Sequence, residues 1–146
     1  MILFCDTSAL VKLYVHEDGS DDMVREAAAS DLIAVCRIAW VETMSAMARR
    51  SREQPRDAVT ITRARHRVVT DWPHYLTLDL TQELVELAGE YADAFALRAY
   101  DSVQLAAVQT LHRELPGEVR FACFDGRLMK AARVLGIGSI GAIEAI

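Results

Sequence analysis

The chain opens with Met1-Ile2-Leu3-Phe4-Cys5-Asp6-Thr7-Ser8, an apolar run that is too short for a helix and stops at an aspartate. Such a run predicts a buried β-strand. Because Asp6 follows the run directly, its carboxylate is expected at the carboxyl end of that strand. Comparable settings recur downstream at Glu42, Asp101 and Asp125, each in or next to an apolar segment. Four isolated acids on hydrophobic scaffolding suggest one shared pocket.

Apolar strand-like runs alternate with helical patterns along most of the 146 residues. Strands are predicted at 2–5, 32–36, 75–78, 119–124 and 137–140, and helices at 8–16, 20–29, from 38 onward, 55–69, 82–96, 99–115 and 127–135. Buried strands that alternate with helices predict a parallel sheet covered on both faces. The sequence therefore predicts an α/β fold: residues 1–146 form a single domain, a three-layer α/β/α sandwich around a mostly parallel sheet of four to five strands.

The predicted helices place the acids near one edge of this sheet. On the helix that begins at residue 38, Ile38, Val41, Ser45 and Ala48 repeat at helical spacing, so Glu42 is predicted beside an apolar stripe and half-buried. Ligands of such sheets bind beyond the carboxyl ends of the strands, where Asp6 and Asp125 are expected and where Asp101 can arrive in the first turn of a helix.

Composition narrows the cellular setting. No apolar stretch approaches the span of a bilayer, and the first residues lack the basic flank of a signal peptide, so a cytoplasmic protein without a membrane partner is expected. Cys5, Cys36 and Cys123 lie in apolar runs, are odd in number and lack Cys-x-x-Cys spacing. They are predicted to be buried, reduced thiols.

Electrostatics indicates what the acidic pocket would hold. Two unit charges about 4 Å apart repel by roughly 4 kcal/mol at an effective dielectric constant near 20, so clustered carboxylates need protons or cations. All-oxygen ligand sets suit hard divalent ions such as magnesium or manganese. Each acid also has an ordinary explanation when taken singly: Asp6 and Asp101 as helix N-caps, Asp125 as the start of an Asp-Gly turn, and Glu42 as a surface residue.

A basic segment stands out in a chain whose net charge is −5. Between residues 49 and 67 there are seven arginines against two acids, which leaves the segment with a net charge of +5; the arginines are Arg49, Arg50, Arg52, Arg56, Arg63, Arg65 and Arg67. The segment is either a local patch for a polyanion or a helix pair whose charged face is simply solvated.

The whole pattern resembles the PIN domain family and, within it, the VapC-type toxins of bacterial toxin–antitoxin pairs. The resemblance spans nearly the full chain, and its carriers are Asp6-Thr7-Ser8-Ala9-Leu10-Val11-Lys12-Leu13-Tyr14, Glu42, Leu97-Arg98-Ala99-Tyr100-Asp101-Ser102-Val103-Gln104-Leu105-Ala106-Ala107 and Phe124-Asp125-Gly126-Arg127-Leu128. It implies that Asp6, Glu42, Asp101 and Asp125 are the catalytic, metal-binding acids and that Ser8 supports their pocket. Gln104 and Cys123 depart from the family pattern: many relatives carry histidine at the first position and threonine or serine at the second.

The resemblance implies a PIN-like fold and a metal-dependent endoribonuclease that uses Mg²⁺ or Mn²⁺. The expected substrate is single-stranded or looped RNA, cut to leave a 5′-phosphate and a 3′-hydroxyl. Arg49, Arg50 and Arg52 follow Glu42 on the same predicted helix and could guide phosphates to the metal. The implied protein partners are a small antitoxin and a second copy of the chain in a homodimer. The alternative is a PIN-like binding subunit with weak or no turnover, which acts through a partner complex.

Overall fold

The computed structural model describes residues 1–141, and its centre is a five-stranded sheet in which every neighbouring pair of strands is parallel. The strand order is β3-β2-β1-β4-β5, so the first strand of the chain lies in the middle. The strands are β1 (Ile2–Cys5), β2 (Leu32–Cys36), β3 (Leu76–Leu78), β4 (Val119–Ala122) and β5 (Ser139–Ile140). The predicted α/β fold is confirmed, with five strands that are all parallel.

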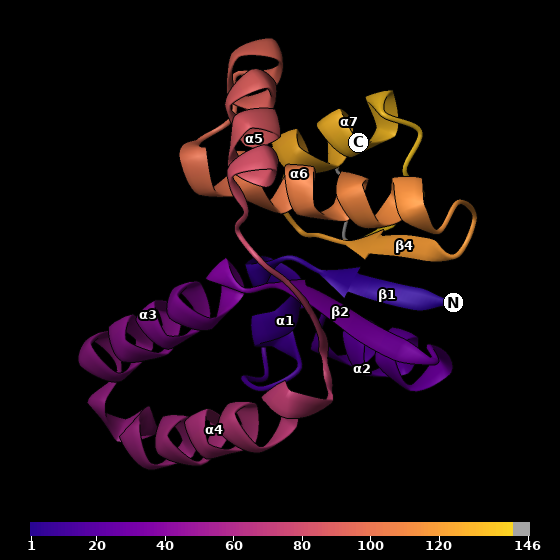
Figure 1. Ribbon diagram of the computed structural model, residues 1–146. Helices are drawn as coiled ribbons and strands as arrows, with labels where there is room; N and C mark the ends of the chain where they lie inside the picture. Colours follow the sequence, from indigo (N-terminus) through magenta and orange to yellow (C-terminus); the bar gives the residue numbers. More distant parts are fainter. Residues whose placement is uncertain (142–146) are drawn as a thin grey trace.

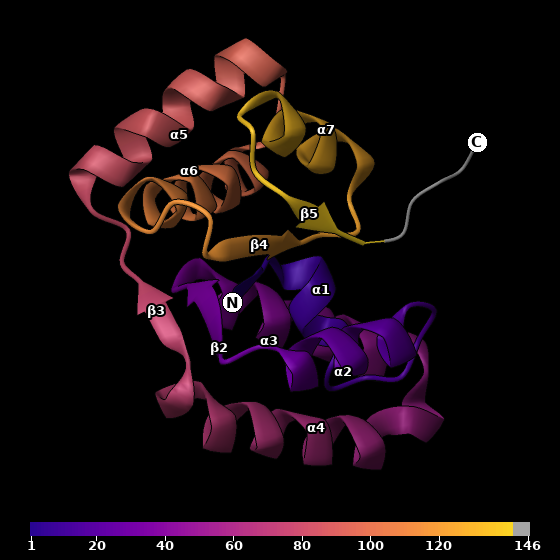
Figure 2. The same cartoon turned by 90° about the vertical axis from the view of Figure 1, so that its right-hand side faces the viewer.

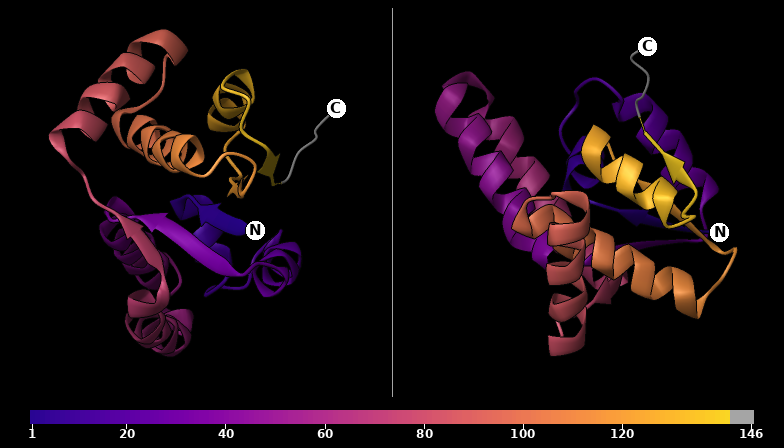
Figure 3. Two further views of the ribbon diagram at one scale, coloured as in Figure 1. Left: turned by 45° about the vertical axis from the view of Figure 1, so that its right-hand side comes forward. Right: turned by 90° about the horizontal axis from the view of Figure 1, so that it is seen from above.

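Helices cover both faces of this sheet, with α1 to α4 on one side and α5, α6 and α7 on the other (Figures 1 and 2). The left panel of Figure 3 shows the three layers most directly. The helices are α1 (Thr7–Lys12), α2 (Ser20–Ala29), α3 (Ile38–Glu53), α4 (Ala58–Asp71), α5 (Gln82–Phe95), α6 (Ala99–Glu114) and α7 (Gly126–Val134), with short 3-10 turns η1 (Pro55–Asp57) and η2 (Trp72–His74). No helix in the described part of the chain combines the length and apolarity that crossing a bilayer requires.

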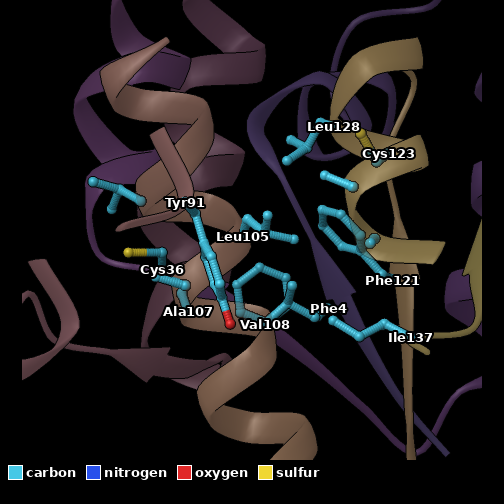
Figure 4. Close-up of a cluster of buried hydrophobic side chains, with 14 of the residues drawn as sticks. Phe4, Cys36, Tyr91, Leu105, Ala107, Val108, Phe121, Cys123, Leu128 and Ile137 are labelled. Atoms are coloured by element: carbon cyan, nitrogen blue, oxygen red, sulfur yellow. The ribbon is translucent and has the colours of Figure 1, made fainter. Parts of the chain in front are cut away.

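Alternation along β1 divides the core between the two layers. Leu3 and Cys5 belong to the cluster under α1 to α4, whereas Phe4 belongs to the cluster under α5 to α7, because successive side chains of a strand point to opposite faces. Figure 4 shows the second cluster, where the rings of Phe4 and Phe121 meet edge to face with centroids 5.9 Å apart. The edge-to-face contact locks neighbouring strands β1 and β4 together beneath α6.

The three cysteines are buried and free, as predicted. Burial raises the pKa of the thiols of Cys5, Cys36 and Cys123, which keeps them protonated and unreactive.

Several element boundaries differ from the sequence prediction, and at two of them a side chain accepts a backbone hydrogen bond. The helix predicted at 8–16 spans only Thr7–Lys12, and Asp6 is its N-cap, because the aspartate carboxylate accepts the N–H of Ala9. The strand predicted at 119–124 ends at Ala122, and the N–H of Phe124 donates to Ser8 Oγ. In both places a side-chain oxygen accepts a backbone N–H at a junction between a strand and a helix.

The buried stripe predicted for α3 was wrong. Val41 is 55% exposed, and the side chains that α3 buries are Ala39, Thr43 and Met47, at spacing i, i+4, i+8. This face contributes Ala39 and Met47 to the core cluster beneath α1 to α4. Glu42 lies next to this stripe and is half-buried, as predicted.

Candidate functional site

Asp6 lies where β1 ends and α1 begins, and it is almost fully buried. Its Oδ1 accepts hydrogen bonds from the N–H of Ala9 at 2.9 Å and from the hydroxyl of Ser8 at 2.7 Å. The ordinary explanation of Asp6 as a helix N-cap is therefore correct, but it engages only one carboxylate oxygen. Oδ2 takes no part in the cap and is free to serve another role.

Ser8 links Asp6 to the opposite loop of the site. Its hydroxyl donates to Asp6 Oδ1 and accepts from the N–H of Phe124 at 3.0 Å. Residues 8 and 124 are 116 positions apart in the chain, and this contact joins the β1–α1 junction to the β4–α7 junction. The serine predicted to support the pocket thus contacts one of the predicted acids directly.

Asp125 repeats the arrangement of Asp6 at the end of the neighbouring strand. Its Oδ1 accepts the N–H of Leu128 at 2.9 Å and so caps α7. The N–H of Asp125 itself donates to Cys123 Sγ at 3.3 Å, which holds the loop after β4 in place. Because β1 and β4 are adjacent and parallel, both capping aspartates lie at the same edge of the sheet.

Asp101 lies in the first turn of α6 and is half-buried. It is not the N-cap, since that position belongs to Arg98, and the structure gives its side chain no hydrogen bond within residues 1–141. Burial raises the pKa of Asp101, the negative charges of Asp125 and Glu42 raise it further, and Arg98 opposes them. Asp101 is thus a carboxylate without a structural task and with two like charges near it.

Glu42 faces the same region from α3. Its Oε1 accepts a hydrogen bond from the Thr7 hydroxyl at 2.8 Å and another from Gln104 Nε2 at 2.9 Å. The first partner begins α1 and the second lies on α6, so three helices meet at this carboxylate. Thr7 and Gln104 were not predicted as contacts of Glu42, although the position of Gln104 one helical turn after Asp101 was a usable signal.

Charge effects on pKa link the other three acids to Asp101. Burial raises the pKa of Asp6 to about 6; hydrogen bonds from Ser8 and Ala9 oppose the shift, and the charge of Asp101 adds to it. Asp101 in turn is influenced by Glu42 and Asp125. The residues, separated by up to 119 positions in sequence, are therefore electrostatically coupled through Asp101 rather than scattered over the surface.

The chemistry of this donor set fits a hard divalent cation. In residues 1–141 no three His, Cys, Asp or Glu side chains are already gathered into a ligand shell for one ion. The site nevertheless offers four carboxylates, and the raised pKa values of Asp6 and Asp101 mark negative charge that a cation would neutralise. A cation at this edge of the sheet would relieve the repulsion that the fold imposes.

The three arginines predicted to bind RNA differ in whether they are exposed or already paired with an acid. Arg50 pairs with Asp57, with Nε and Oδ2 3.3 Å apart, whereas Arg49 and Arg52 are exposed. Seven residues separate Arg49 from Glu42, so Arg49 lies on the same face of α3, roughly 10 Å further along the helix axis. Among these three arginines, Arg49 is the exposed one on the Glu42 face of α3.

Another member of the basic segment has a structural role. Arg67 donates to the backbone carbonyl of Tyr14 at 2.6 Å, and its guanidinium lies 5.7 Å from the centre of the Tyr14 ring. This contact ties α4 to the end of the α1 region. Arg67 and Arg50 thus make contacts within the protein, which neither explanation of the basic segment predicted.

A groove of about 1000 Å³ lies elsewhere on the molecule, between β3, α5 and α6. None of the four acids lines it; its floor includes Leu76, Leu87 and Leu111. The groove is therefore separate from the acidic site.

Known proteins match this chain over most of its length. The family model described as PIN domain matches residues 3–133. Ribonuclease VapC45 of Mycobacterium tuberculosis (strain CDC 1551 / Oshkosh) is 30% identical over 135 residues, which cover 92% of each chain. Ribonuclease VapC49 of the same species (strain ATCC 25618 / H37Rv) matches with the same identity and coverage.

Solved structures share the fold at lower identity. The crystal structure of Mycobacterium tuberculosis VapC20, described as a Sarcin-Ricin loop cleaving toxin, has a TM-score of 0.63 at 19% identity and covers 88% of this chain and 94% of that one. VapBC2 from Rickettsia felis, bound to a DNA fragment from its promoter, also has a TM-score of 0.63, at 12% identity, and covers 98% of this chain and 100% of that one.

Proposed function

Since the chain belongs to the PIN domain family, we propose that it is a metal-dependent endoribonuclease and the toxin of a toxin–antitoxin pair. One observation carries the proposal. At the carboxyl edge of a parallel sheet, the charge of Asp101 acts on Asp6, and the charges of Asp125 and Glu42 act on Asp101. The pKa values of Asp6 and Asp101 are raised. Relatives named as ribonucleases, at 30% identity over 92% of the chain, support the reaction class.

The proposed cofactor is Mg²⁺ or Mn²⁺, held by Asp6, Glu42, Asp101 and Asp125. Such an ion, when bound, withdraws charge from the scissile phosphate and lowers the pKa of a coordinated water. The chain supplies the carboxylate oxygens that its caps leave free: Oδ2 of Asp6 and Oδ2 of Asp125 are not used by the helix N-termini. Asp101, without a hydrogen bond of its own in the described residues, is the carboxylate most free to orient water or metal.

The proposed substrate is single-stranded or looped RNA. Glu42, Asp101 and Asp125 are partly exposed, and exposed arginines follow Glu42 along α3, where guanidinium groups can pair with phosphates. A loop-cleaving toxin among the proteins of the same fold is consistent with a looped substrate. The expected products carry a 5′-phosphate and a 3′-hydroxyl.

The proposed partners are a small antitoxin and a second copy of the chain. Structural neighbours of this fold include a toxin–antitoxin complex from Klebsiella pneumoniae and the VapBC2 complex, which supports an antitoxin partner. An arginine or lysine side chain of the antitoxin would neutralise the acidic site in place of a metal ion. Copurification with a protein encoded beside this chain, and loss of cleavage on adding it, would test this partner.

Cleavage of a panel of structured RNAs during a manganese titration tests the reaction. The wild-type protein should cut at least one RNA only when the ion is present, and Asp101→Asn should remove cleavage. The matched control is Asp93→Asn, an exposed aspartate on α5 that should leave activity unchanged. RNA binding without metal, unaffected by Asp101→Asn and without products, would instead support the alternative of a silent binding subunit.

The arginine assignment has its own test. Arg49→Ala and Arg52→Ala should weaken RNA affinity and lower its salt dependence, by about 0.7 in the log–log slope for each single-strand phosphate that an arginine no longer neutralises. Arg50→Ala should have less effect on RNA, since Arg50 already pairs with Asp57. Unchanged affinity in the triple alanine variant would remove these arginines from the RNA path.

A further inference from the structure

Gln104 is a buried polar residue beside the acidic site whose task the proposed reaction does not explain. It lies on α6 one helical turn after Asp101 and is only 2% exposed. Its amide nitrogen contacts Glu42 Oε1 at 2.9 Å and Thr7 Oγ1 at 3.2 Å. Its amide oxygen is buried and has no hydrogen-bond partner within residues 1–141.

The three contacts form a consistent donor–acceptor network. The Thr7 hydroxyl donates its single proton to Glu42 Oε1, so the Thr7 oxygen is left to accept from Gln104. Gln104 Nε2 carries two protons, one for the threonine oxygen and one for the glutamate. The opposite amide orientation would place the Gln104 carbonyl oxygen against a carboxylate, so the network fixes Nε2 toward Glu42.

Stability alone does not account for this glutamine. An apolar side chain of the same shape would leave no buried oxygen unpartnered and would suit the surrounding core, where Val103, Leu105 and Val108 are buried. The amide nitrogen instead places its two protons on the glutamate and on the threonine that also binds the glutamate. Both hydrogen-bond donors therefore act on the Glu42 carboxylate.

We propose that Gln104 and Thr7 are positioning residues that hold the Glu42 carboxylate for a divalent cation. Both bonds fall on Oε1, which fixes the rotation of the carboxylate and leaves Oε2 as the oxygen available to the ion. The inference rests on the proposed metal dependence, but it concerns a separate question, namely what orients one ligand. Groups that orient metal ligands in this way typically change metal affinity by about 10- to 100-fold when they are removed.

Mn²⁺ binding in the absence of RNA tests the proposal directly, by calorimetric titration of the intact chain. Gln104→Met, which keeps volume but loses both donors, should weaken Mn²⁺ affinity by about 10-fold or more, and its melting temperature checks that it is folded. Gln104→His, which retains a ring N–H donor, should recover part of the affinity. The matched control is Gln109→Met, because Gln109 is a second buried glutamine of α6 with an unpartnered oxygen and no contact with Glu42.

If Gln104 acts by positioning Glu42, the effects of Gln104→Met and Glu42→Gln on Mn²⁺ affinity should not add. In a Glu42→Gln background, Gln104→Met should cause no further decrease in Mn²⁺ affinity. If Gln104→Met fails to fold, Thr7→Val provides the same measurement from the other side of the network. Wild-type affinity in folded Gln104→Met or Thr7→Val overturns the inference alone, whereas a wild-type protein that binds no Mn²⁺ overturns the proposed metal dependence as well.

Discussion

Replacing Asp6 with asparagine should stabilise the metal-free protein at neutral pH, although it removes a proposed metal ligand. The asparagine oxygen can still accept the N–H of Ala9 and the hydroxyl of Ser8, so the cap of α1 persists. What disappears is a buried negative charge. Burial raises the pKa of Asp6 from 3.8 to about 6, a shift of about two units, which corresponds to roughly 3 kcal/mol.

The sign of the pH dependence follows from this shift. Folded Asp6 keeps its proton to a higher pH than the unfolded chain does, so its stabilising contribution is full below pH 3.8 and is lost as pH rises through about 6. Asp6→Asn lacks this dependence. Its advantage in unfolding free energy over the wild type should therefore grow by about 2 kcal/mol between about pH 4.5 and pH 7.5.

Urea unfolding in EDTA, followed by tryptophan fluorescence, measures this difference. Trp40 and Trp72 contact each other edge to face with ring centroids 5.2 Å apart, so their emission should change when α3 and α4 separate. Asp93→Asn, at an exposed position, is the control and should show no growing difference. Added Mn²⁺ should stabilise the wild type and not Asp6→Asn. A difference between Asp6→Asn and the wild type that does not change with pH would refute the assignment of a buried charge cost to Asp6.

Three further changes separate structure from chemistry. Asp125→Ala should lose the α7 cap and about 1 kcal/mol of stability in urea unfolding, whereas Asp125→Asn should keep the cap. Both variants should lose Mn²⁺-dependent RNA cleavage. Cleavage by either variant would contradict the assignment of Asp125 as a metal ligand. Phe121→Ala should lower the unfolding free energy by about 3–5 kcal/mol, since the ring is fully buried, and a decrease below about 1 kcal/mol would contradict its core role. Gly19→Ala should lower stability by about 1 kcal/mol or more, measured by thermal melting, because φ of Gly19 is +91° and a Cβ would come within 2.8 Å of the Phe124 ring. An unchanged melting temperature would count against this strain.

The layered fold was predictable because its signals are local. Continuous apolar runs of four or five residues separated by helical patterns can be satisfied only by a sheet buried on both faces, and all five strands were found. The helix faces were less predictable. On α3 the apolar spacing of Val41 suggested a buried side chain, yet the helix is rotated so that Ala39, Thr43 and Met47 face the core and Val41 is exposed. The hydrophobic pattern constrains a helix to be amphipathic, but neighbouring helices set its rotation.

The candidate site divides along the same line. The sequence by itself determined which acids follow strands or begin helices, since Asp6 and Asp125 end apolar runs and parallel strands bring their carboxyl ends to one edge. Only the tertiary structure decided which carboxylate oxygen accepts the hydrogen bond of each helix cap. It also decided that Arg50 forms an ion pair with Asp57 and that Thr7 and Gln104 both donate to one oxygen of Glu42. The physical reason is the separation, along the sequence, of the residues that make each contact. Caps and strand ends depend on residues a few positions apart, whereas the Glu42 contacts join residues 35 and 62 positions away, and packing of three helices must first bring them together.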